Sequence, residues 1–177
     1  MRTAGAISSN WRYDAPSLPL RPLNGYRDPM TELRTQTRGD YPHSLAIPTR
    51  WMDCDAYGHV NNVIYYAMMD QVVTEFILGA GVIAMGTSPS IGLCVESACQ
   101  FYQSIEFPEI VEARLRIGHI GSKSVRYEIG LFRASKPHPV GAGHFVHVYV
   151  DRQTREPVLR TDVQRAALLP LFDNQGK

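Results

Sequence analysis

The sequence predicts an α+β fold in which a five-stranded antiparallel sheet is wrapped around one long central helix. Residues 60–78 contain neither proline nor internal glycine and are apolar around most of the helical circumference, which indicates a helix enclosed by other structure. Residues 45–51 and four segments after the helix alternate apolar and other side chains, as strands do. Since no second long helix lies between those segments, this helix must cover the apolar face of the sheet.

The first 43 residues form a proline-rich extension. They hold five prolines and follow neither a strand period nor a helix period, so we expect irregular structure over residues 1–43 and a folded domain over 44–177. The spacing from Pro16 to Pro22 is that of a polyproline ligand, and arginine without lysine suggests a transit peptide. Four acidic residues count against the transit peptide. The simplest interpretation is a tail that wraps its own oligomer.

The elements of the domain follow in order. We expect a strand from Leu45 to Trp51, a turn at Asp53, and a helix that asparagines cap and Gly79 ends. A short helix near Thr161 closes the chain. The four later strands are expected to share these apolar faces: Leu93, Val95, Cys99 and Phe101; Val111, Ala113, Leu115 and Ile117; Val125, Tyr127, Ile129 and Leu131; Ala142, His144, Val146, Val148 and Val150.

Charge and cysteine content exclude several classes of function. The net charge of +1 gives no electrostatic footprint for nucleic acid or an anionic membrane surface. Three cysteines without CxxC spacing argue against a disulfide framework or a thiolate metal site, and His144 and His147 fall on opposite faces of a strand. No apolar run is long enough for a membrane span, and no secretory signal is evident. We expect a cytoplasmic protein without metal or cofactor.

Polar residues gather in the turn before the long helix. Asp53 and Asp55 are two apart, and we expect only one of them to face a cleft. A carboxylate beside a helix N-terminus can attack a carbonyl, or activate water, while free backbone amides polarise the carbonyl oxygen. Structural interpretations are equally open, because an aspartate there is often a cap, Gly58 suits an ordinary tight turn, and His59 can be a satisfied structural residue.

Residues 50–66 read Arg-Trp-Met-Asp-Cys-Asp-Ala-Tyr-Gly-His-Val-Asn-Asn-Val-Ile-Tyr-Tyr, which closely resembles the signature of hotdog-fold thioesterases of the 4-hydroxybenzoyl-CoA thioesterase-like group. Plant acyl-carrier-protein thioesterases are more distant relatives. The resemblance covers about residues 44–170, and residues 96–108 and 121–125 resemble the family's strand before a loop and its hairpin. The family's fold, a sheet around a central helix, agrees with the architecture that periodicity predicts.

The resemblance implies an acyl-CoA thioesterase whose catalytic carboxylate is Asp55, acting as nucleophile or general base. Backbone amides from Gly58 to Val60 would hold the thioester oxygen while CoA thiolate leaves. His59 matches a catalytic histidine of the plant enzymes. Tyr57 stands where those enzymes carry an asparagine, and the region of their glutamate falls near Ser104. Asp53 is expected to be scaffolding.

Other residues are candidates for holding the substrate. Asn62 would support the site, and Tyr65 would line an acyl pocket together with nearby methionines. CoA phosphates need cations, for which the hairpin and the strands beside it offer candidates. These additional substrate-binding candidates are Met68, Met69, Lys123, Ser124, Arg114, Arg116 and Arg126.

The resemblance also implies a homodimer or homotetramer, because relatives join two subunits into one continuous sheet and build the site between them. Asp70 would tie the helix into that interface. Two other functions are open on the same fold, a non-catalytic acyl-CoA or acyl-carrier binding protein and a thioester hydratase or dehydratase. The set Asp55, Gly58, His59 and Asn62 favours catalysis over binding, and the acid's place before the helix argues against a hydratase.

Overall fold

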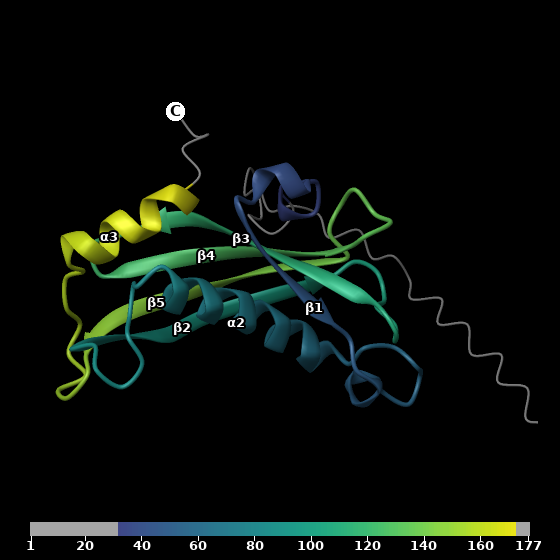
Figure 1. The fold of residues 1–177 in the computed structure, drawn as a ribbon, viewed down its shortest axis with the longest axis horizontal. Coiled ribbons are helices and arrows are strands. Elements are labelled where there is room, and N and C mark those ends of the chain that lie inside the picture. Colours follow the sequence, from purple (N-terminus) through teal and green to yellow (C-terminus); the bar gives the residue numbers. More distant parts are fainter. Residues whose placement is uncertain (1–31, 173–177) are drawn as a thin grey trace, which may run out of the picture.

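Helix α2 (Asn62–Gly79) lies across one face of a five-stranded sheet in the computed structural model, which describes residues 32–172 (Figure 1). The strands are β1 (His43–Pro48), β2 (Ser90–Phe101), β3 (Ile110–Ile120), β4 (Ser124–Arg133) and β5 (Gly141–Asp151). Their order across the sheet is β1-β3-β4-β5-β2, and all neighbouring strands run antiparallel. The predicted α+β architecture is confirmed. Most of the proposed extension, including its polyproline-like spacing, lies outside the described residues.

The core lies between α2 and the sheet. The predicted inner faces of β3 and β4 are fully buried there, together with Met69 and Val72 of the helix. Two glycines of β5 allow α2 to approach closely. A Cβ on Gly141 would lie 3.0 Å from the Tyr65 ring, and one on Gly143 would lie 2.5 Å from Met69 Cε. The N-terminal half of α2 is therefore seated directly on the backbone of β5.

The first predicted strand is shifted. β1 begins at His43 and ends at Pro48, and Trp51 belongs to a short 3₁₀ helix, η2 (Trp51–Asp53). The prediction of a strand through Trp51 is wrong because Asp53 accepts hydrogen bonds from Arg50 and turns the chain there. Local side-chain hydrogen bonds of this kind compete with strand pairing.

Two predicted strand faces are also corrected. The register of β2 shifts between Cys94 and Glu96, so Leu93 and Phe101 point to opposite faces. On β5 the residues that face α2 are Phe145 and every second residue on either side of it. The predicted set, Ala142, His144, Val146, Val148 and Val150, lies on the outer face. Both faces of β5 are apolar, so alternation could not select the inner one.

Residues 32–42 pack on the outer face of the sheet. Leu33 and Tyr41 are both buried, and Tyr41 packs edge-on against Phe132 of β4. The Arg38 guanidinium donates to the Glu112 carboxylate at 2.8 Å and to two backbone carbonyls at and beyond the end of β4. The described end of the proposed extension is thus held on the sheet by apolar packing and by ionic hydrogen bonds.

The predicted C-terminal helix is α3 (Asp162–Leu168), which Thr161 caps by accepting from the Gln164 amide. Leu168 is fully buried in the core. Within residues 32–172, no helix has the length and apolarity that crossing a membrane requires.

Candidate active site

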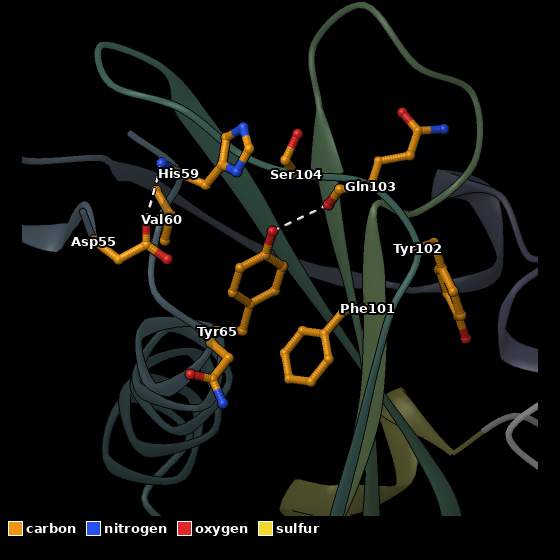
Figure 2. A pocket seen from close by; sticks show the side chains of 9 residues that line it. Asp55, His59, Val60, Tyr65, Phe101, Tyr102, Gln103 and Ser104 are labelled. Atoms are coloured by element: carbon orange, nitrogen blue, oxygen red, sulfur yellow. Dashed lines mark hydrogen bonds between the residues drawn. The ribbon is translucent and has the colours of Figure 1, made fainter. Parts of the chain in front are cut away.

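A pocket of about 360 Å³ opens at the N-terminal end of α2 (Figure 2). One part of its lining comes from the turn before α2 and the first helical turn, and the other from the end of β2 and the residues that follow it. The lining residues are Asp55, His59, Val60, Asn62, Tyr65, Phe101, Tyr102, Gln103 and Ser104. The fold therefore brings five of the predicted site residues together. It adds Phe101, Tyr102 and Gln103, which sequence reasoning did not select and which carry no catalytic motif.

Asp53 holds the turn that carries the site. Its carboxylate accepts hydrogen bonds from the Arg50 amide and from Arg50 Nη2, both at 2.7 Å, and only 3% of the residue is exposed. Hydrogen bonding from Arg50 holds the pKa of the Asp53 carboxyl below its usual range. The Asp53 carbonyl accepts from the Asn61 amide at 2.9 Å, which fixes the start of α2. Asp53 is thus a structural residue.

Asp55 faces the pocket from a tight turn. Its Oδ1 accepts from the Tyr57 amide at 2.8 Å and more weakly from the His59 amide at 3.4 Å. Gly58 donates its amide to the Asp55 carbonyl and has φ of +80°, a left-handed conformation that favours glycine. Asp55 Oδ2 accepts no hydrogen bond from the described residues. One carboxylate oxygen is therefore held in place and the other is available.

The backbone amides of the turn are nearly all engaged. The amides of Gly58 and His59 donate to the carbonyl and the carboxylate of Asp55, respectively. The Val60 amide donates to the Ile105 carbonyl at 2.8 Å, and the Asn61 amide donates to the Asp53 carbonyl. The amide of Asn62, the first residue of α2, has no acceptor in the described part of the chain. The amides from Gly58 to Val60, expected to face the substrate, are used by the turn itself. Asn62 presents an available donor at the positive end of the helix dipole.

Tyr65 spans the pocket from α2 to the segment after β2 (Figure 2). Its hydroxyl donates to the Gln103 carbonyl at 3.0 Å, and its ring packs edge-on against Phe101 with centroids 5.1 Å apart. Burial raises the pKa of Tyr65, so the hydroxyl remains a donor at neutral pH. Met68 and Met69 are core residues outside the lining.

The predicted CoA-binding residues do not join this pocket within one chain. Lys123 and Ser124 lie where β4 begins, at the opposite end of the sheet, separated from the pocket by the length of β3, about 35 Å. The arginines of the outer face are ion-paired with glutamates: Arg114 with Glu112, and both Arg116 and Arg126 with Glu128. Gly58 and Tyr57 are exposed beside the pocket.

The two strand histidines point in opposite directions, as predicted. His144 bonds Glu96 on the outer face at 2.8 Å, and His147 packs against Tyr127 and Phe145 on the inner face. Burial lowers the pKa of His147, with the Asp70 charge as a smaller opposing influence. Over residues 32–172, no group of three histidine, cysteine or acidic side chains is arranged to hold a metal ion.

A sheet wrapped around one helix, with a pocket at the helix N-terminus, defines a hotdog-fold protein. The model of the thioesterase-like superfamily matches residues 49–168. In a solved structure, the PA5185 protein from Pseudomonas aeruginosa strain PAO1 is 39% identical, with 78% of this chain and 96% of that chain covered and a TM-score of 0.74. The chain therefore belongs to the thioesterase-like superfamily.

More distant solved structures share the fold. The gentisyl-coenzyme A thioesterase BH1999 is 22% identical, with coverage of 71% of this chain and 99% of that chain and a TM-score of 0.64. Slr0204, a 1,4-dihydroxy-2-naphthoyl-CoA thioesterase from Synechocystis, is 11% identical, with coverage of 72% and 96% and a TM-score of 0.66. At these identities the similarity establishes the fold alone. No protein of curated function matches the chain in sequence.

Replacing Asp53 by alanine removes the acceptor for the Arg50 amide and guanidinium. We expect the free energy of unfolding to fall by about 1–3 kcal/mol, the usual range for removing one partner of a charged hydrogen bond. Urea denaturation measures this, with Asp55→Ala as the comparison that should cost less stability. Because the folded-state pKa of Asp53 lies below 3.8, the difference from wild type should be complete above that pH and shrink as pH falls further. A pH-independent difference would contradict the ion-paired role.

Proposed function

We propose that this protein hydrolyses acyl-CoA thioesters, with Asp55 as the catalytic carboxylate and the Asn62 amide as the group that polarises the thioester carbonyl. The observation that carries the proposal is that Asp55, with one carboxylate oxygen left without a donor, and Asn62, with an unengaged backbone amide, line the same pocket at the positive end of α2. Membership of the thioesterase-like superfamily supports thioester hydrolysis. Acyl-CoA thioesterases among the structures that share the fold support CoA as the thiol.

The proposed chemistry needs one negative and one positive group on opposite sides of the carbonyl. The carbonyl oxygen accepts from the Asn62 N–H, so that charge developing on the oxygen is stabilised by that donor and the helix dipole. Asp55 then either attacks the carbonyl carbon, forming a mixed anhydride that water hydrolyses, or removes a proton from an attacking water. In both routes the C–S bond breaks and CoA leaves as a thiolate, which needs little protonation because thiols ionise near pH 8.5. His59, exposed at the rim of the pocket, is proposed to assist the departing sulfur.

Asp55→Asn should lower kcat by about 10²–10⁴-fold, since the amide neither attacks nor accepts a proton from water. Thiol release from acyl-CoA measures this, and Asp162→Asn, an exposed change on α3, is the matched control. Equal rates for Asp55→Asn and wild type would show that Asp55 is not the catalytic group. If neither protein hydrolyses any thioester but both bind acyl-CoA tightly, the non-catalytic binding function is correct instead.

Asn62→Pro tests the amide directly. Proline is well tolerated at the first position of a helix, and Asn61, with φ −60° and ψ 143°, already has the conformation that a residue before proline adopts. The substitution removes the N–H, and we expect kcat to fall by about 10²–10³-fold, as for the loss of one oxyanion-hole donor. Asn62→Ala, which keeps the N–H and removes the side chain, is the control and should retain most activity. Similar losses in both variants would assign the effect to the side chain.

The complete site is proposed to require two copies of the chain. β2 is an edge strand that exposes Val95 and Leu93, and unpaired edges of this kind are templates for pairing. Two β2 edges pairing antiparallel would bring the Phe101 end of one strand next to the Ser90 end of the other. The Lys123 carbonyl accepts from Tyr149, close to that Ser90 end in the sheet. Lys123 and Ser124 of a second copy could therefore flank the pocket and supply a cation for CoA.

Subunit mixing tests this arrangement. Asp55→Asn homodimers lack the carboxylate, and Lys123→Ala homodimers should have a raised KM for acyl-CoA. Mixed dimers contain one site with both wild-type residues, so their activity at low substrate should exceed that of either parent. We expect the rate of thiol release to rise after the two variants are mixed, and sedimentation should confirm that the protein is dimeric. A monomer in solution, or no recovery in mixed dimers, would contradict the shared site.

A further inference from the structure

The aromatic rings of Tyr65 and Phe101 lie against each other in the pocket lining, between α2 and β2 (Figure 2). Their planes are nearly perpendicular, at 84°, in the edge-to-face arrangement that aromatic pairs favour. Tyr65 is buried, whereas Phe101 is about half exposed. One ring comes from the helix and the other from the edge strand, so the pair bridges the two walls of the pocket.

Tyr65 is fixed at both ends of its side chain. Its hydroxyl donates to the Gln103 carbonyl, and its ring rests against Gly141 of β5, where any Cβ would come within 3.0 Å. Rotating the ring out of this position would break a partly buried hydrogen bond and would remove the ring from close packing. The Tyr65 ring is therefore held in place, whereas the Phe101 ring is about half exposed and accepts or donates no side-chain hydrogen bond.

The residues that pack behind the ring pair are apolar. Cys99 is the next residue of β2 on the same face as Phe101, and it packs against the core. Burial raises the pKa of its thiol to about 12, so the sulfur is uncharged. Met69, seated on Gly143, is the neighbouring helical side chain. A hydrocarbon chain that displaced the rings would therefore meet apolar side chains and no charged group.

We propose that the Tyr65–Phe101 ring pair restricts this protein to short-chain acyl groups. The inference rests on the proposed thioesterase function and assigns the substrate class of that site. The pocket that one chain forms measures about 360 Å³ and must hold the thioester and the adjoining part of the acyl group. A long chain must displace Phe101 or leave its methylenes in water, and in either case the binding contribution of those methylenes is lost.

The test is the chain-length profile of the full-length protein. We expect wild type to hydrolyse acetyl-, butyryl- and hexanoyl-CoA with higher kcat/KM than octanoyl- or dodecanoyl-CoA. Phe101→Ala removes a half-exposed ring, so the fold should be retained. The ratio of kcat/KM for octanoyl-CoA to that for butyryl-CoA should rise by about tenfold or more, the discrimination that a few methylenes in a pocket provide.

Two matched variants separate the ring pair from other effects. Val63→Ala changes an exposed apolar residue of α2 outside the pocket lining and should leave the profile unchanged. Tyr65→Phe keeps the ring but removes the hydroxyl, and the profile should broaden less than in Phe101→Ala. An unchanged profile in Phe101→Ala, or a wild type that prefers dodecanoyl-CoA, overturns the ring-pair proposal while leaving thioester hydrolysis intact. Absence of hydrolysis on every acyl-CoA overturns the proposed function itself.

Discussion

The hydrogen bond from the Val60 amide to the Ile105 carbonyl joins the two stretches of chain that make the pocket. On one side is the turn that Asp53 and Arg50 hold, and on the other is the segment that follows β2. A second bond, from the Tyr65 hydroxyl to the Gln103 carbonyl, connects the same two stretches one helical turn further on. With both bonds in place the carboxylate, the helix terminus and the aromatic wall have fixed relative positions, as a preorganised site requires.

The arrangement of backbone donors explains how this turn can be stable and still leave polar groups available. A tight turn before a helix has several amides that need acceptors, and here the amides from Tyr57 to Asn61 all donate within the chain. Asn62 is the position at which the turn has ended and the helical ladder has not yet begun. Its amide is thus left available by geometry, in a place where the helix dipole favours negative charge. One oxygen of Asp55 is also available, because both amides that donate to its carboxylate bind the other oxygen.

The two faces of the sheet make different contacts. The inner face packs on α2 and forms the core behind the site, and glycines 141 and 143 bring helix and sheet close enough to leave the Tyr65 ring as a rigid wall. The outer face carries ion pairs between arginines and glutamates, and residues 32–42 cover part of it with Leu33 and Tyr41. The arginines and glutamates paired on this face, Arg114 with Glu112 and Arg116 with Glu128, therefore stabilise the outer surface, whereas Arg133 at the end of β4 donates to the carbonyl of Ser104 in the pocket lining.

The sequence by itself determined the α+β class, the long central helix, the inner faces of β3 and β4, and the turn that holds Asp55, because those features follow from local periodicity and capping. It could not place the face of β5, where both sides are apolar, or the bulge of β2, which depends on pairing with its neighbour. Only the tertiary structure brought Phe101 to Ser104 against the turn and showed which amide is unengaged. Those outcomes depend on contacts between residues some forty positions apart, and such contacts leave no local signal in the chain.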